Sequence, residues 1–351
     1  MARPPDVGRL DDVIAALGVL LGGGQELVVH RQPPGGPDLV LQAPDVAFAV
    51  EWKSAGDPAN VGAAIRMLVA LEQPRGRRAM PLVPVVAVPF MGETGRRMCA
   101  GAGLSWIDLS GNGWIEAPGL RIRILGQPNR FASRGRPADV FAPRSSRVVR
   151  ALLMQPDRAF TQSELVALTG VDKGRVSRLV RRLEAMELLA REGARSVRLK
   201  DPAVALDAWR EAYEFGRHDV RRGHVAVRDA DELVRRIAES SPPPSDRWAL
   251  TGLAAAWRLT QHALFRLVTI LVAHQPSDDW LRRVGFREEA RGANLWIVRP
   301  SDAAALDGAA EAQGVPCAQP LQVYLDLKAH PERAREAADE LRRLVLDREH
   351  A

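Results

Sequence analysis

The sequence predicts a multidomain protein of the α/β and α+β classes with three folded regions. A chain of 351 residues has the length of two or three ordinary domains. Short apolar runs with strand and helix spacing alternate over the first 126 residues, whereas residues 144–201 are basic and mostly helical. Residues 246–351 again mix the two spacings, which predicts a C-terminal α/β domain.

The first region, residues 1–126, is expected to form an α/β domain. Apolar residues from Leu10 to Leu21 recur at helical spacing, and Gly22 begins a glycine run that ends the helix. Turn residues separate the apolar runs that follow, among them the Pro-Pro-Gly-Gly segment at 33–36. These runs predict strands at 26–30, 38–41 and 46–52, a helix at 57–72, a strand at 83–88, a helix at 94–102, and strands at 104–109, 114–115 and 120–125. The expected order is therefore αβββαβαβββ.

Proline-rich segments separate the regions. Residues 127–143 hold three prolines and four charged residues, and residues 241–245 contain three consecutive prolines, which cannot continue a helix. Residues 203–240, which directly precede the second of these segments, are expected to form a helical connector that is broken near Gly223. The last helix is expected at 331–347, with a proline at its start.

Positive charge is concentrated in the middle of the chain. Basic residues exceed acidic ones by five between Arg121 and Arg144 and by six between Arg147 and Lys200, so the net charge of +6 leaves the rest at −5. A localised basic region is typical of a nucleic-acid surface, and a solvated charged face is the alternative. Lysine is rare, with 4 lysines beside 45 arginines, and Lys53 and Lys173 both lie in motifs described below.

Several classes of protein are excluded by composition. The two cysteines, Cys99 and Cys317, form no CxxC pair, which argues against a disulfide scaffold and a cysteine zinc site. The most apolar long run without a charge, 79–91, is too short to span a bilayer, and the N-terminus lacks the order of an export signal. We therefore expect a cytoplasmic protein without a membrane segment.

Residues 144–201 carry the strongest local signal. A first helix is expected at 146–154, and Thr161 and Glu164 have the spacing of a capping box at the start of a second helix. A third helix, 173–186, has a buried stripe of Val176, Leu179, Val180 and Leu183. Two strands joined through Gly193 follow it. The candidate DNA-binding residues lie away from the stripe or near the strand tip: Lys173, Arg175, Ser177, Arg178, Arg181, Arg182, Arg191 and Arg195.

This order is that of a helix-turn-helix with a β wing. The segment TQSELVALTGVDKGRVSRLVRRLEAMELLARE resembles the MarR-type winged helix, over about 55 residues. The resemblance implies that the third helix enters the major groove of double-stranded DNA while the wing touches the backbone or the minor groove. A winged helix that only contacts protein is the alternative.

A second motif lies in the first region. Asp38 follows a proline, and twelve residues separate it from Glu51-Trp52-Lys53; strand alternation places Glu51 and Lys53 on one face. The pattern resembles the PD-(D/E)xK restriction-endonuclease-like family, which implies catalytic roles for Asp38, Glu51 and Lys53 and binding of Mg²⁺ by Asp38 and Glu51. The alternative is a binding module in which Lys53 forms a structural ion pair with Glu51 or Asp38.

The stretch from Ser105 to Ile115 contains Gly-Asn-Gly between two apolar segments. Such a sequence predicts a hairpin with a tight turn, because glycine tolerates positive φ. The functional alternative is that Asp108 and Asn112 border the Asp38 site.

Three segments of the C-terminal region resemble AbiEi-type antitoxin-like regulators: RWALTGLAAAWRL, NLWIVRP and PLQVYLDLKAHPERAREAADELRR. The resemblance implies repression of the system's own promoter and binding of a cognate toxin. The region also resembles a degenerate nucleotidyltransferase fold without transferase activity, with Asp326 and Glu332 at the surface. The seven histidines offer no pair with zinc-ligand spacing.

The function favoured by these features is that of a bacterial DNA-binding transcriptional regulator, antitoxin-like, with a homodimer as a further expectation. The enzyme alternative is a Mg²⁺-dependent endonuclease delivered to DNA by its winged helix. A third alternative, compatible with the first, is a binder that holds a protein partner through its C-terminal domain.

Overall fold

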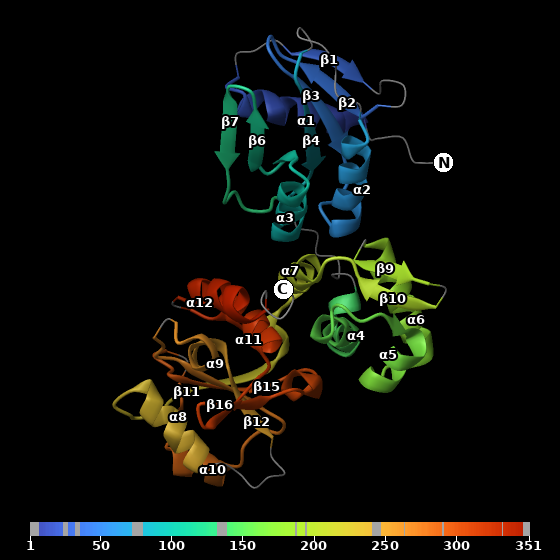
Figure 1. Cartoon of the computed structure of the whole chain (residues 1–351). Helices are drawn as coiled ribbons and strands as arrows, with labels where there is room; N and C mark the ends of the chain where they lie inside the picture. The colour runs from blue at the N-terminus through green and yellow to red at the C-terminus, as the bar shows by residue number, and fades with distance from the viewer. Residues whose placement is uncertain are drawn as a thin grey trace. The chain divides into compact units, whose positions relative to one another are not determined.

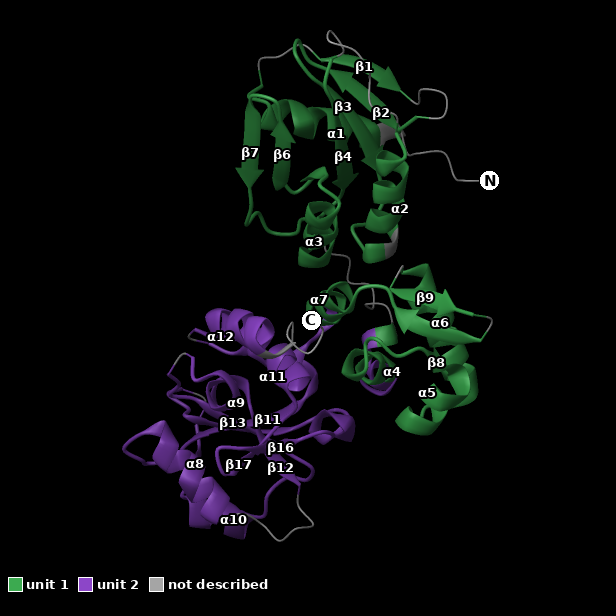
Figure 2. Cartoon of the chain, viewed as in Figure 1, with its two compact units in different colours: residues 1–140, 148–211 green, residues 141–147, 212–351 purple. Residues whose placement is uncertain are grey.

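The fold is described from a computed structural model of the whole chain (Figure 1). The residues described are 7–23, 27–31, 36–71, 80–131, 139–186, 188–193, 195–240, 247–262, 264–289, 291–331 and 333–346. The predicted turn at 33–35 and the proline segment at 241–245 lie outside them, as do residues 132–138 of the first linker. The chain forms two compact units, residues 1–140 with 148–211 and residues 141–147 with 212–351 (Figure 2).

The first unit begins with a seven-stranded sheet in the order β1-β2-β3-β4-β5-β6-β7. β3 pairs in parallel with β4, and β4 with β5, while the flanking pairs are antiparallel. Its elements are α1 (Val7–Leu20), β1 (Val28–Arg31), β2 (Leu39–Gln42), β3 (Ala47–Trp52), α2 (Pro58–Val69), β4 (Leu82–Val88), α3 (Glu93–Gly101), β5 (Ser105–Asp108), β6 (Gly113–Ala117) and β7 (Leu120–Ile124). The predicted order αβββαβαβββ is confirmed.

Helices cover both faces of this sheet. Val85 and Ala87 of β4 pack in the core cluster that includes Val13 and Leu17 of α1. The alternate residues of β4 pack in the opposite cluster, which includes Val61 of α2 and Cys99 of α3. Because successive strand residues point to opposite faces, β4 is buried on both sides.

The remainder of the first unit contains the second sheet, in the order β8-β10-β9. The helices and strands of this part of the chain are α4 (Pro143–Met154), β8 (Phe160–Thr161), α5 (Gln162–Thr169), α6 (Lys173–Ala185), β9 (Leu189–Glu192), β10 (Ser196–Leu199) and α7 (Pro202–Ala212). The first residues of α4, 143–147, and the last residue of α7, Ala212, belong to the second unit. The expected three helices and two-stranded wing are confirmed, and β8 adds a short third strand.

The second unit is built on a mixed seven-stranded sheet, in the order β14-β11-β15-β13-β12-β17-β16. Figure 1 draws α11 and α12 on one side of this sheet and α8 and α10 on the other. The strands are β11 (Asp219–His224), β12 (Trp248–Thr251), β13 (Val268–Val272), β14 (Arg287–Glu288), β15 (Leu295–Arg299), β16 (Ala310–Ala312) and β17 (Val315–Cys317). The helices are α8 (Ala230–Glu239), α9 (Gly252–Thr260), α10 (Asp278–Val284), α11 (Pro320–Asp326) and α12 (Ala334–Leu341), followed by a π-helical turn at Arg342–Leu346.

The expectation of an all-helical segment at 203–240 is wrong at β11. This strand pairs with β15, with Val220 opposite Val298, and on its other side with β14. Gly223 lies within the strand, where a Cβ would stand 2.4 Å from the Phe286 ring and from the Arg287 carbonyl oxygen. The glycine therefore permits close strand packing and does not mark a break between helices.

Asp326 was expected at the surface, and this expectation is wrong because its side chain is fully buried. Its carboxylate accepts hydrogen bonds from the Tyr213 hydroxyl (2.5 Å), the Thr251 hydroxyl (2.5 Å) and the Gln322 amide (2.9 Å). Tyr213 also contacts His218 Nε2 at 2.7 Å. A buried carboxylate is tolerated when donors satisfy it in this way. The other residue expected at the surface, Glu332, lies outside the described residues.

Replacing this carboxylate tests its structural role. We expect Asp326→Ala to lower the free energy of unfolding by about 3 kcal/mol, because two buried donors, Thr251 and Gln322, and the half-buried Tyr213 lose their acceptor. Urea unfolding monitored by tryptophan fluorescence measures the loss. Glu311→Ala removes an exposed carboxylate of the same unit and should change stability by less than about 0.5 kcal/mol. Equal stability of the two variants would contradict the role given to Asp326.

Candidate nucleic-acid interface

The start of α6 is fixed by Asp172. Its carboxylate accepts a hydrogen bond from the Arg175 backbone N–H at 2.8 Å, which satisfies one donor at the helix N-terminus. Val176 and Val180 are fully buried, and Leu179 and Leu183 are buried beside them, as the sequence predicted. One side of α6 is thereby held against the core, and its other residues face away.

A capping box fixes the preceding helix, α5. The Thr161 hydroxyl accepts from the Glu164 backbone N–H at 3.2 Å, and the Glu164 carboxylate accepts from the Thr161 backbone N–H at 2.8 Å. Arg158 donates to the same carboxylate at 2.7 Å. The Thr161 N–H, then its hydroxyl, and then Arg158 lower the pKa of Glu164 from 4.5 to about 2.

The side of α6 that faces away from the core is basic. Among the eight residues predicted to bind DNA, six side chains are exposed and Arg175 and Ser177 are half-buried. The exposed ones are Lys173, Arg178, Arg181 and Arg182 on α6, and Arg191 and Arg195 on the wing. Gly193, at the tip of the wing, has φ of +67°, a conformation that favours glycine.

Acidic neighbours compensate only part of this charge. Arg191 forms an ion pair with Glu184 at 2.8 Å. Arg198 of β10, which the sequence analysis did not single out, is paired with Glu192 at 3.1 Å. Over the described parts of the chain, no carboxylate forms an ion pair with Lys173, Arg178, Arg181, Arg182 or Arg195. Among the residues that the structure describes, these five exposed side chains therefore have no acidic partner to compensate their positive charge.

The structure also brings Asp38, Glu51 and Lys53 together. Leu39 pairs with Val50, so Asp38 and Glu51 lie side by side where β2 begins and β3 ends. The Lys53 ammonium is 2.6 Å from Glu51 Oε1, and the Asp38 backbone N–H donates to Glu51 Oε2 at 3.3 Å. Asp38 Oδ2 accepts from the Trp52 backbone N–H at 3.0 Å. The shared face that alternation predicted for these residues is therefore present.

Neighbouring groups already donate hydrogen bonds to these carboxylates. Three of the four carboxylate oxygens of Asp38 and Glu51 already accept from Lys53 or from backbone N–H groups. A divalent cation at Glu51, whose side chain is 9% exposed, would compete with the Lys53 ammonium for the same carboxylate. In the described part of the chain, no group of three or more His, Cys, Asp or Glu residues is placed to hold a metal ion. The contacts favour the ion-pair alternative.

Asp108 and Asn112 shape their own turn. The fully buried Asp108 carboxylate accepts from the backbone N–H groups of Met91, Ser110 and Asn112 and from the Asn112 side-chain amide, all at 2.9–3.1 Å. Gly111 has φ of +101°, and Trp106 pairs with Trp114 across the hairpin. The contacts favour the hairpin interpretation of this stretch.

Comparison with known proteins identifies one part of the chain. Residues 141–198 match the model of the MarR family, so this part is a MarR-type winged helix domain. No curated protein and no solved structure matches the chain. Among the helices of the described residues, none is both long and apolar enough to cross a membrane.

The capping box gives a prediction for stability. We expect Thr161→Ala to lower the free energy of unfolding by about 1 kcal/mol at neutral pH, because α5 loses its N-cap. Because folding lowers the pKa of Glu164 from 4.5 to about 2, its stabilising contribution is complete above pH 4.5 and disappears as the pH falls toward 2. Thr161→Ala keeps the backbone donor and removes the hydroxyl that also donates to this carboxylate at 2.8 Å, so the part of the difference that comes from this second hydrogen bond should disappear over the window.

Urea unfolding at several pH values measures that difference. Thr161→Ser keeps the hydroxyl and should behave like the wild type. A difference between Thr161→Ala and wild type that stays constant from pH 5 to pH 2 would contradict the role of the Thr161–Glu164 contact.

Proposed function

We propose that the protein is a transcriptional regulator that binds double-stranded DNA through α6 and the wing. The observation that carries the proposal is the row of exposed, uncompensated basic residues on α6, in a domain that matches the MarR family. In this proposal, the protein regulates transcription by occupying a promoter, where it excludes or recruits other proteins.

Each group of residues has its own role in this proposal. α6 enters the major groove, where Arg178 and Arg181, which lie three residues apart, reach base edges or the flanking phosphates. Lys173 and Arg182, near the two ends of the helix, contact phosphates and set its register. Arg195 of the wing approaches the backbone or the minor groove. Arg191 contributes less, because Glu184 compensates its charge.

The finer part of the proposal is an antitoxin-like regulator that represses its own promoter and binds a toxin through its second unit. The antitoxin-like role is supported by the three C-terminal sequence segments that resemble AbiEi-type regulators. The restriction-endonuclease-like and nucleotidyltransferase-like folds, the homodimer and the cytoplasmic location likewise rest on sequence alone and stay predictions. Footprinting of the purified protein on its own upstream DNA tests self-repression directly.

A metal-dependent nuclease is the second candidate function. The observation that favours it is the convergence of Asp38, Glu51 and Lys53 at one edge of the sheet. It is the weaker candidate because the Lys53 ammonium already pairs with Glu51 and a cation would compete with it.

Two measurements separate the two functions. With millimolar Mg²⁺ or Mn²⁺, we expect no rise in melting temperature and no cutting of supercoiled plasmid, since Lys53 already neutralises Glu51. The matched variants are Asp38→Asn with Glu51→Gln for melting and Glu51→Ala for cutting. Metal-dependent cutting by the wild type that Glu51→Ala abolishes would make the nuclease the leading function.

Substitution of the exposed arginines tests the regulator. Arg178→Ala and Arg181→Ala should each weaken specific DNA binding by about 1–3 kcal/mol if the side chain contacts a base. If it contacts a phosphate, the dependence of affinity on salt should become less steep instead. Gel shifts on the footprinted DNA at several salt concentrations measure both quantities.

Arg335→Ala is the matched control, because Arg335 is an exposed helical arginine of the second unit. It removes the same charge and should leave affinity within about twofold of the wild type. If the Arg178→Ala, Arg181→Ala double variant binds as tightly as the wild type, α6 is not the DNA-binding element.

A further inference from the structure

A histidine of the second unit connects the buried Asp326 network to the segment that follows β15. His218 is half-buried and lies directly before β11. Its Nε2 is 2.7 Å from the Tyr213 hydroxyl, which donates to Asp326. Its Nδ1 is 3.1 Å from the Ser301 backbone nitrogen and 3.3 Å from the Ser301 hydroxyl. The imidazole ring therefore joins the start of β11 to the segment after β15.

These contacts fix the protonation state of the His218 ring. A backbone N–H can only donate, so the Nδ1 atom that accepts from the Ser301 N–H must be unprotonated. The proton of the neutral ring is then on Nε2, which donates to the Tyr213 hydroxyl oxygen. The hydroxyl proton of Tyr213 is donated in turn to Asp326 at 2.5 Å. All these groups are satisfied when the ring is neutral.

A second proton on the ring breaks the contact with Ser301. Protonated Nδ1 is a donor, and it faces the Ser301 backbone N–H, which is also a donor. The Ser301 hydroxyl can turn and accept from the charged ring, but the backbone N–H cannot. Burial lowers the pKa of His218 below 6.5, and the Asp326 carboxylate opposes this effect only in part. The contact is therefore complete above pH 6.5 and is lost as the pH falls through the lowered pKa.

The ionisable groups nearest His218 lie on its own segment, on β15 and the residues after it, and around α11. They are Tyr213, Glu214, Arg217, Asp219, Arg299, Asp302, Asp326, Lys328 and His330. Arg217 is paired with Glu214 at 2.8 Å. Arg299 is paired with Asp219 at 3.2 Å. Since each of these pairs is neutral overall, Asp326 is the member of this set whose charge acts on the ring.

The segment held by His218 anchors the start of α4. Asp302, next to Ser301, accepts from the Arg147 guanidinium in three contacts of 2.5–3.0 Å. The Asp302 side chain is 10% exposed, and it also accepts from the Ala304 backbone N–H at 3.0 Å. Arg147 lies in the part of α4 that belongs to the second unit. The carboxylate that holds the start of α4 is thus one residue from the His218 contact.

We propose that His218 is a pH-sensitive switch: the neutral ring holds Ser301 and Asp302 in place at the start of α4, and protonation releases this segment and weakens DNA binding. α4 belongs to the same MarR-type domain as α6. When its anchor is loosened, the start of α4 has to be ordered again as the domain binds DNA, which costs conformational entropy. The effect on DNA binding rests on the proposed function, whereas release of the segment does not.

Hydrogen exchange of the full-length protein tests the release. After correction for the intrinsic pH dependence of exchange, peptides that cover 299–306 should exchange about fivefold faster or more at pH 5 than at pH 7.5 in the wild type. His218→Asn keeps an acceptor for the Ser301 N–H and cannot be protonated, so it should show no such increase. His274→Asn is the matched control, because His274 is an exposed histidine of the same unit, and it should behave like the wild type. Circular dichroism melting verifies that the variants are folded.

A measurement on the wild type alone tests the same switch. Nitrogen-15 NMR of the histidine rings should show His218 protonated at Nε2 only at pH 7.5 and at both nitrogens at pH 5. Its signals are identified by their loss in His218→Gln. A His218 ring that carries its proton on Nδ1 at pH 7.5 would overturn the switch.

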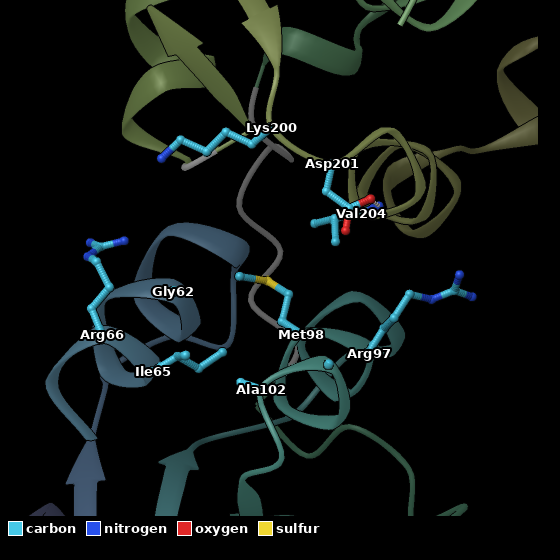
Figure 3. A pocket seen from close by; sticks show the side chains of 10 residues that line it. Gly62, Ile65, Arg66, Arg97, Met98, Ala102, Lys200, Asp201 and Val204 are labelled. Carbon is cyan, nitrogen blue, oxygen red and sulfur yellow. Dashed lines mark hydrogen bonds between the residues drawn. The ribbon is translucent and has the colours of Figure 1, made fainter. Parts of the chain in front are cut away.

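Gel shifts on the footprinted DNA test the effect on binding. Acidification from pH 7.5 to pH 5 should weaken binding by the wild type by about fivefold or more and leave His218→Asn unchanged. Arg147→Gln removes the anchored guanidinium, so it should also lose the pH dependence. Arg97→Gln is its matched control and should keep the pH dependence, because it breaks an ion pair of the first unit, with Asp207 of α7 at 2.6 Å. Figure 3 shows the Arg97 side chain at a pocket of that unit.

The outcomes separate the switch from its effect on DNA. If the wild type shows no faster exchange at pH 5, or if His218→Asn shows the same increase, the switch is overturned whatever the protein does with DNA. If the segment is released but the wild type binds DNA equally well at both pH values, the effect on binding alone is overturned. If the wild type binds no DNA at pH 7.5, the proposed function fails, and the exchange result still decides the switch.

Discussion

Burial of β3, β4 and β5 on both faces is the constraint from which the first unit is built. Parallel strands of this kind expose apolar side chains in both directions, and each face needs a layer of helix. α1 supplies one layer, and α2 with α3 supplies the other. The second layer covers the face of β3 that carries Ala49, and strand alternation puts the buried Glu51 on that same face near the end of the strand.

The parts predicted from sequence are those whose signals are local. Unbroken apolar runs such as 83–88 identify a strand buried on both faces, and the Thr161–Glu164 spacing identifies a helix start without knowledge of any distant residue. The proximity of Asp38 and Glu51 was also predictable, because neighbouring strands with a period of two place both on one face. The hydrogen bonds that these carboxylate oxygens accept could not be predicted from the sequence, because some of the donors are backbone N–H groups of the paired strand.

The missed features depend on partners far apart in the sequence. Asp326 is satisfied by residues 4, 75 and 113 positions away, so no spacing in the sequence indicates that it is buried. β11 has a polar sequence without alternation, and it becomes a strand because β15 and β14 pair with it on either side. The contacts between α3 and α7 join residues over 100 positions apart. Such contacts form only in the assembled fold, so local sequence patterns do not predict them.

The pattern of ion pairs distinguishes the α6 surface from an ordinary charged face. Elsewhere, several exposed arginines on or beside short helices have an acid three or four residues away: Arg282 and Arg283 share Asp279, Arg333 is paired with Glu336, and Arg343 with Glu340. Such pairs keep a helix soluble while adding little net charge or stability. α6 instead places Arg178, Arg181 and Arg182 within five residues without an acidic partner among the residues described. Like charges at this spacing repel, which destabilises an isolated helix. A surface that retains this repulsion is suited to a polyanion, because neutralisation by phosphates relieves it on binding.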